Sequence, residues 1–154
     1  MGDSSIHPQP ELFTYLLMLV LVWRAVLGAL RTLAQESCFR WGEFHKTLRL
    51  SRALRWLSVG GGYRWEAQRL TVLAHEALGN TAEAVRRARI LLASRREAGD
   101  WRIANTVVNT FINAGLYQEA LAVEHSWGSA GERPQDGARL LEWCLVQLNL
   151  VEAV

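Results

Sequence analysis

Prolines, cysteines and strand-like segments are scarce in this sequence. Only three of its 154 residues are proline and two are cysteine. Alternating runs of Val, Ile and Thr, which are typical of half-buried strands, are missing, whereas the helix formers Ala, Leu, Arg and Glu dominate the middle of the chain. Half of the residues are apolar, which is enough to fill a core. We therefore predict an all-α protein with one domain, or a small domain plus a membrane segment.

The residue patterns of metal sites and enzymes are missing as well. Cys38 and Cys144 lie far apart without metal-ligand spacing, and we interpret both as buried small side chains in a reducing compartment. The sequence has no HExxH and no Gly-x-Ser-x-Gly, and no Lys-Ser/Thr follows glycines 60–62 to make a phosphate loop. The four histidines are scattered. We expect no catalytic, cofactor-binding or metal-binding residues, and hence no enzyme.

Residues 12–30 form one long hydrophobic run, LFTYLLMLVLVWRAVLGAL, with Arg24 as its single charge. Residues 16–23 are apolar on every side, so a helix here must be buried in protein or lipid. About 20 residues span a bilayer core. We predict a disordered N-terminus over residues 1–10 and a membrane helix over residues 11–33, in which the long side chain of Arg24 reaches toward the head groups.

Two other interpretations of this run stay open. One is the buried first helix of a soluble cytoplasmic bundle. The other is a cleaved signal peptide, which is disfavoured because no Lys or Arg precedes the run, Asp3 does, and Thr32-Leu33-Ala34 is a poor cleavage site. If the run spans a membrane, the positive-inside rule places the C-terminal part in the cytoplasm, because the basic residues follow the run and none precedes it.

A basic helix face follows the hydrophobic run. Lys46, Arg49 and Arg52 are three residues apart and would share one face, suited to anionic head groups. Together with Trp23 and Arg24 they are our membrane-contact candidates. An ordinary solvated face is the alternative. The formal net charge is only +2, and the arginine-rich residues 86–96 lack interleaved aromatics, so a nucleic-acid partner is disfavoured.

Two segments of the chain, residues 65–84 and 101–120, resemble each other at a constant offset of about 36 residues. The matching pairs are Trp65 and Trp101, Val72 and Val108, Gly79 and Gly115, Glu83 and Glu119, and Ala84 and Ala120. Weaker copies begin at Trp41-Gly42 and end the chain at residues 149–153. We predict that each glycine ends a first helix in a left-handed conformation, and that Ala in the second helix allows close packing.

These residues resemble the tetratricopeptide repeat family. Gly115, Tyr117 and Ala120 match its turn glycine, aromatic residue and alanine, and Gly79 and Ala84 match two of the three. The sequence departs from the family in its spacing and in the absence of the closing proline. The resemblance implies stacked antiparallel helix hairpins, a solenoid, over residues 34–154. The expected helices cover about residues 11–40, 43–57, 64–78, 81–97, 101–114, 117–127 and 137–153.

The same resemblance implies a peptide-binding groove along the first helices of the repeats. The corresponding groove candidates are Arg69, Arg102, Asn105, Asn109 and Asn113. The three asparagines lie four residues apart and share one helix face, where their amides could bond a peptide backbone. A polar, solvated face without a ligand is the alternative.

We also expect tryptophans to fill the core. Trp65 and Trp101 would pack between units, and Trp41, Trp56, Trp127 and Trp143 would be buried. The function that follows is a membrane-anchored, bacterial-type scaffold or accessory subunit, which binds proteins through the groove or through the open C-terminal end of the array. A soluble helical-repeat module that binds a peptide or RNA is the alternative.

Overall fold

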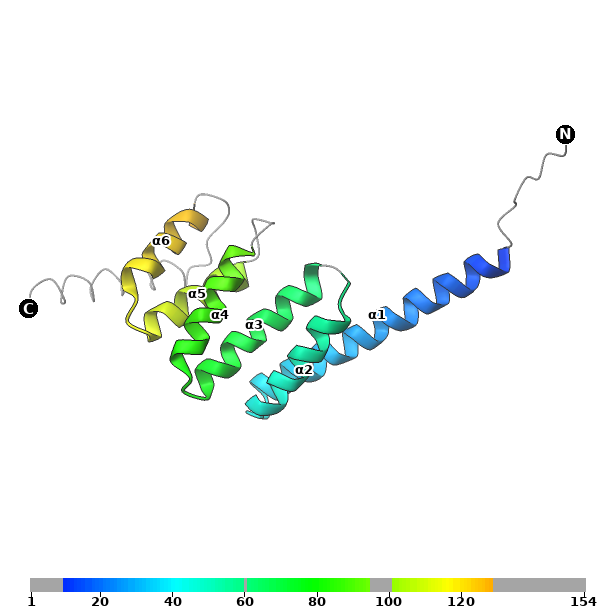
Figure 1. Ribbon diagram of the computed structural model, residues 1–154, viewed down its shortest axis with the longest axis horizontal. Coiled ribbons are helices and arrows are strands. Elements are labelled where there is room, and N and C mark those ends of the chain that lie inside the picture. Colours follow the sequence, from blue (N-terminus) through cyan, green and yellow to red (C-terminus); the bar gives the residue numbers. More distant parts are fainter. Residues whose placement is uncertain (1–9, 60, 95–100, 129–154) are drawn as a thin grey trace, which may run out of the picture.

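The computed structural model describes residues 10–59, 61–94 and 101–128, and all its regular structure there is helical (Figure 1). The six helices of these residues are α1 (Pro10–Phe39), α2 (Phe44–Leu57), α3 (Gly61–Ala77), α4 (Thr81–Ala93), α5 (Trp101–Asn113) and α6 (Tyr117–Gly128). The all-α prediction is confirmed for this part of the chain. The predicted helix over residues 137–153, Cys144, and residues 1–9 of the N-terminus that was predicted to be disordered lie outside it, while Pro10 already belongs to α1.

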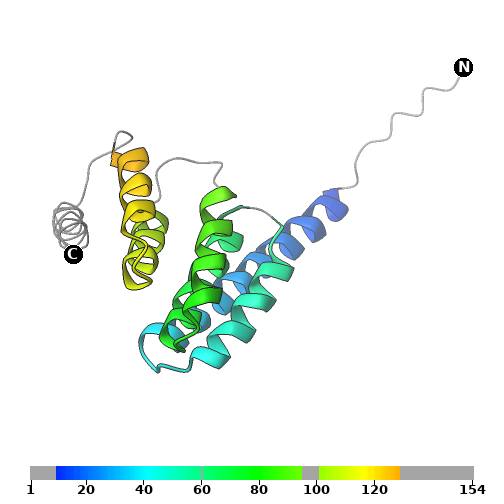
Figure 2. The same cartoon turned by 60° about the vertical axis from the view of Figure 1, so that its left-hand side comes forward.

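Each helix packs against the next one along the chain, and two further contacts join α1 to α3 and α3 to α5. The first helices of the three hairpins, α1, α3 and α5, therefore form a continuous row, and α2 and α4 each pack against the first helices that precede and follow them. The row extends from the α1–α2 hairpin to the α5–α6 hairpin, with α3 and α4 between them (Figures 1 and 2).

Glycines with a left-handed backbone follow the first helices of the second and third hairpins, α3 and α5. Gly79 and Gly115 both have φ of 74°. At the first turn, the N–H of Gly79 donates to the carbonyl of Glu76 at 2.9 Å and the N–H of Asn80 donates to the carbonyl of His75 at 2.9 Å. The Gly115 turn has the same two bonds, to Ile112 and Phe111. This pair of bonds is the Schellman motif, which satisfies carbonyls at the helix end. The predicted hairpins at Gly79 and Gly115 are present.

A buried small residue occupies the same place in the second helix of each hairpin. Thr47, Ala84 and Ala120 each follow the turn glycine by five residues, and all three are 0% exposed. Each donates its backbone N–H to the carbonyl four residues earlier, at 2.9–3.0 Å. Small side chains here let the two helices of a hairpin approach closely. The local geometry therefore recurs three times, in the order that the sequence comparison predicts.

The core divides into a large and two small clusters. The large one joins α3, α4, α5 and α6 around Phe111, Val107 and Leu91. Leu27, Leu54 and Ala67 form one small cluster, and Ala34, Cys38 and Leu70 form the other; both join α1 to α2 and α3. The second half of α1 is therefore part of the bundle, whereas its first half projects beyond the end of α2 (Figure 2).

Some boundaries differ from the sequence-based expectations. Helix α3 begins at Gly61, three residues before the expected start, so two of the three consecutive glycines belong to its first turn. A first turn makes few intrahelical bonds through its own N–H groups, and glycine costs less there than in a helix interior. Helix α1 is continuous across the predicted boundary between residues 33 and 34. Helix α4 ends at Ala93, before a segment that is outside the described residues.

Candidate interaction surfaces

The first half of α1 is an exposed apolar surface. Every residue from Glu11 to Val26 is classed as exposed, and Phe13 and Tyr15 reach 68% and 73%. The helix is long and apolar enough to cross a membrane, and only 6% of its most apolar 18-residue stretch is buried. A core helix of a soluble protein would be mostly buried. In the part of the chain that the structure describes, nothing covers this surface.

The second half of α1 is held firmly by the bundle. Leu27 is 5% exposed and packs with Leu54 of α2 and Ala67 of α3. Further along, Ala34 and Ser37 are 0% exposed. Trp23 and Arg24, two of the predicted membrane contacts, lie just before Leu27, where the helix emerges from the bundle. Trp23 is 41% exposed, and Arg24 is exposed as well.

The outer face of α2 bears a stripe of exposed residues. His45, Arg49, Arg52 and Trp56 follow each other at intervals of four, three and four residues and are all exposed, which places them on one helix face. The structure thus brings the predicted contacts Arg49 and Arg52 together. Lys46 lies to one side of this stripe. Its Nζ pairs with Glu43 at 2.7 Å and lies 4.9 Å from the ring centre of Trp41.

Trp56 is not a core residue, contrary to the expectation for this tryptophan. Its side chain is 81% exposed, and that of Val59 beyond the end of α2 is 95% exposed. Leu54 fills the core on the opposite face of α2 and is 0% exposed. Residues two apart on a helix point about 200° apart, so the buried Leu54 directs Trp56 outward. Trp41 is 47% exposed, whereas Trp65 packs against the large core cluster as predicted.

Polar contacts join α1 to α3 and α3 to α5, and Glu66 of α3 makes the first of them. Its carboxylate accepts hydrogen bonds from Gln35 Nε2 of α1 at 2.6 Å and from Arg69 Nε and Nη2 at 2.9 and 2.8 Å. The two charged side chains are only 11% and 12% exposed. Burial alone would raise the pKa of Glu66, but the bonds from Arg69 and Gln35 and the charges of Arg69 and Arg31 outweigh it, so this pKa lies below its usual value of 4.5.

A second polar cross-link joins α3 to α5. Thr110 Oγ1 donates to Glu76 Oε2 at 3.1 Å, and Asn113 Nδ2 donates a short hydrogen bond to Glu76 Oε1. The sequence patterns did not predict Gln35, Glu66 or Glu76 as functional residues. The three-residue spacing of Glu66 and Arg69 was the one readable signal, since such pairs meet on a helix surface.

These cross-links divide the predicted groove residues into two groups. Arg69 is hydrogen-bonded to Glu66, and Asn113 is hydrogen-bonded to Glu76. Asn105 and Asn109 bond each other at 3.3 Å on an exposed part of α5, and Arg102 is also exposed and has an interaction of its own. Asn105 and Asn109 therefore keep free amide capacity for a partner, because one bond uses only one donor and one acceptor of the pair.

The arginines of α4 are paired with glutamates. Glu83 accepts hydrogen bonds from Arg86 and Arg87, and these bonds lower its pKa to about 2. Arg89 pairs with Glu119 of α6 at 2.8 Å. Their positive charge is largely neutralised by this pairing, which weakens the phosphate-binding interpretation of the run. Among the described residues, no group of three or more His, Cys, Asp or Glu is placed to hold a metal ion.

No family model, curated protein or solved structure matches the chain. Its function must therefore be argued from these three surfaces: the exposed half of α1, the outer face of α2, and the polar face of α5.

Proposed function

We propose that the protein is a membrane-anchored helical-repeat scaffold that holds another protein at the membrane surface. The observation that carries this proposal is the division of α1 into two halves within one continuous helix. The half before Leu27 is apolar and exposed, and the half from Leu27 onward packs against α2 and α3. Such a helix couples a lipid-embedded segment rigidly to the bundle, whose stacked hairpins form a tetratricopeptide-like solenoid.

The packed half of α1 also argues against a cleaved signal peptide. Cleavage near Ala34 would remove Leu27 and Leu30 from the cluster that joins α1 to α2 and α3. It would also separate the buried Ala34 from the helix before it. Each large apolar side chain removed from a core costs about 2–5 kcal/mol, so the bundle would be poorly stable without them.

The distribution of basic residues sets the orientation of the anchor. Arg31, Arg49 and Arg52 follow the exposed apolar half, while residues 1–10 contain no Lys or Arg. By the positive-inside rule, the helical bundle faces the cytoplasm of a bacterial-type membrane.

The amides of Asn105 and Asn109 on α5 are the proposed contact for a protein partner. Asn105 is exposed and Asn109 is half-buried, whereas Val107, Val108 and Phe111 of the same helix lie in the core. A hydrogen bond joins the two asparagines to each other. Extended peptide backbone presents alternating donors and acceptors, which such amides can bond. The partner that fits best is an extended segment of another protein.

Affinity capture from membranes tests this function. The full chain, solubilised in mild detergent, should retain a defined protein partner, and the double substitution Asn105→Ala and Asn109→Ala should abolish its capture. Gln118→Ala with His125→Ala, at two exposed positions of α6, is the matched control and should retain it. Equal recovery of the partner with all three proteins would remove α5 from the binding site.

A further inference from the structure

Most arginines of the described residues fall into two groups according to whether they form an ion pair with a glutamate. Five arginines pair with a glutamate: Arg40, Arg69, Arg86, Arg87 and Arg89. Six others form no ion pair within the described residues: Arg24, Arg31, Arg49, Arg52, Arg55 and Arg64. All six belong to α1, α2 or the first turns of α3.

The sequence around these unpaired arginines has no acidic residue. Neither residues 12–35 nor residues 44–65 contain an Asp or a Glu. The charged side chains of residues 12–35 and 44–65 are therefore all basic, although the whole chain has a formal net charge of only +2. Like charges repel one another, and an anionic surface close to these arginines would relieve that repulsion.

Two exposed apolar side chains lie among these arginines. Trp56 and Val59, with 81% and 95% of their surface exposed, stand between Arg55 and Arg64 along the chain. Tryptophan is enriched at the boundary between lipid and water, where its ring is apolar and its N–H is wet.

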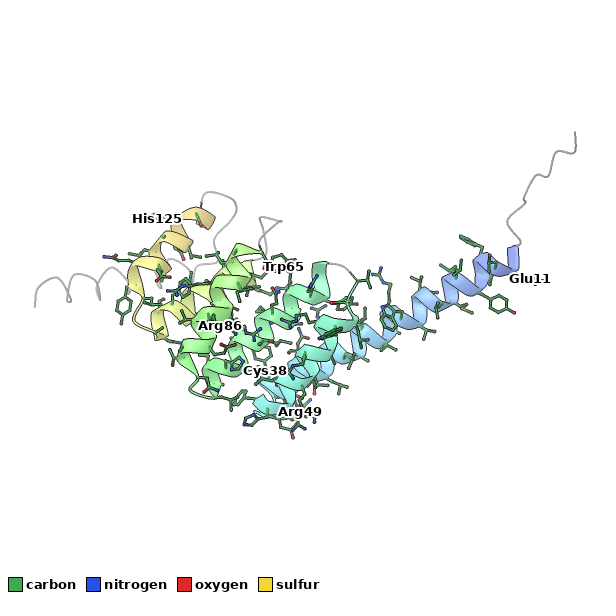
Figure 3. All side chains as sticks on the ribbon, viewed as in Figure 1. Glu11, Cys38, Arg49, Trp65, Arg86 and His125 are labelled. Atoms are coloured by element: carbon green, nitrogen blue, oxygen red, sulfur yellow. The ribbon has the colours of Figure 1, made fainter. Side chains whose placement is uncertain are left out.

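The position of this cluster along α1 matches the edge of a bilayer. At 1.5 Å per residue, the exposed residues 11–26 span about 24 Å. Residues 27–30, the first that pack against the bundle, bring the length to about 30 Å, the thickness of a hydrocarbon core. Leu30, at the end of that span, packs in the same cluster as Leu57 and Tyr63, the neighbours of Trp56 and Arg64. Glu11 lies at the far tip of the projecting helix, and Arg49 lies toward the end of α2 that is remote from it (Figure 3).

We propose that Arg52, Arg55, Trp56, Val59 and Arg64 form a junction surface that rests on the anionic head groups of the membrane that α1 spans. The arginines bind lipid phosphates, and Trp56 and Val59 enter the boundary between head groups and acyl chains. Arg24 reaches the same layer from within the span. This inference rests on the proposed anchor, and it adds a second contact that fixes the depth and tilt of the bundle.

A fluorescent reporter on the full chain tests the junction surface. The substitution Val59→Cys, in a chain with Cys38→Ser and Cys144→Ser, is labelled with the environment-sensitive dye NBD. The protein is reconstituted into vesicles of phosphatidylcholine, with or without phosphatidylglycerol, and aqueous iodide is added as a quencher. His45→Cys is the matched control, because it lies on the same face of α2 but at its far end.

With phosphatidylglycerol present, we expect several-fold weaker quenching and a blue-shifted emission at position 59, and unchanged quenching at position 45. The triple substitution Arg52→Gln, Arg55→Gln and Arg64→Gln should restore the quenching seen in phosphatidylcholine. Arg86→Gln, Arg87→Gln and Arg89→Gln remove as many charges from paired arginines of α4 and should leave the protection intact.

Three results would overturn the junction surface. One is equal quenching in both kinds of vesicle, another is protection that survives the triple substitution, and the third is protection by soluble RNA instead of anionic vesicles. Alkaline carbonate extraction of the same vesicles distinguishes a failure of the junction surface from a failure of the proposed membrane anchor. If the protein resists extraction but the label at position 59 is accessible to iodide, only the junction surface is refuted. If carbonate releases the protein, the membrane anchor is refuted as well.

Discussion

Gln35 of α1 donates a hydrogen bond of 2.6 Å to Glu66 of α3, 31 residues further along the chain. The same carboxylate holds Arg69, so one buried acid fastens the anchor helix to the bundle. Glu66→Ala would leave Arg69 without a partner at 12% exposure. We expect a loss of about 1–3 kcal/mol in the free energy of unfolding, measured by urea titration in detergent.

Glu36→Ala is the control for this substitution. Glu36 pairs with Arg40 at 3.7 Å, and the Arg40 side chain is 75% exposed. Exposed pairs contribute little, so the change should stay within about 0.5 kcal/mol. Equal effects of the two substitutions would mean that the α1–α3 cross-link contributes nothing specific.

Acid should weaken the protein through the same residue. The pKa of Glu66 is lower in the folded protein than its usual value of 4.5. The folded state then binds fewer protons, so the stabilisation is fully present above pH 4.5 and is lost as the pH falls through the lower, folded pKa. Urea midpoints followed from neutral to acidic pH should fall less steeply for Glu66→Gln than for the unaltered chain. If the urea midpoints of the two proteins fall equally with pH, Glu66 is not the group that makes the stability depend on acid.

The turn glycines should resist substitution for a purely conformational reason. A Cβ at Gly79 or Gly115 meets nothing within 4 Å, but both residues have φ of 74°. Gly79→Ala and Gly115→Ala should each lower the free energy of unfolding by about 1–2 kcal/mol. Gly62→Ala also meets nothing within 4 Å and lacks the positive φ, so it should cause no loss. Thermal unfolding followed by circular dichroism distinguishes the two cases.

The buried alanines test the repeated packing between hairpin helices. Ala84 is 0% exposed, whereas Ala82 on the same helix is exposed. Ala84→Leu should destabilise the protein by about 1–3 kcal/mol because the added side chain forces α3 and α4 apart. Ala82→Leu should change stability by no more than about 0.5 kcal/mol. If Ala84→Leu is tolerated equally well in urea titration, the two helices do not pack closely at this position.

The features that could be predicted from the sequence are those that depend on residues close together along the chain. Gly79 and Gly115 marked two helix ends, and the repeat around them placed Ala84 and Ala120 in buried positions. The helix start at Gly61 was missed because glycines usually indicate a loop, and the packing of Tyr63 and Ala67 overrides that tendency here.

The contacts between helices could not be predicted in the same way. Glu76 bonds Asn113 across 37 residues, and that pairing depends on the register of α3 against α5, which no local pattern specifies. The exposure of Trp56 was missed for a related reason. Composition favours a buried tryptophan, but Leu54 determines which face of α2 the bundle covers.

The central claim is that the first half of α1 lies in lipid, and alkaline carbonate extraction of membranes containing the full chain tests it most directly. Leu17→Lys with Leu21→Lys changes two residues that are 50% and 54% exposed, so the bundle itself is untouched. In a bilayer each lysine costs about 2.5–3.5 kcal/mol near the helix centre. We predict that the unaltered chain and a Leu17→Ala, Leu21→Ala control stay in the membrane pellet, while the lysine variant is released. Release of the unaltered chain, or retention of the lysine variant, would contradict the account.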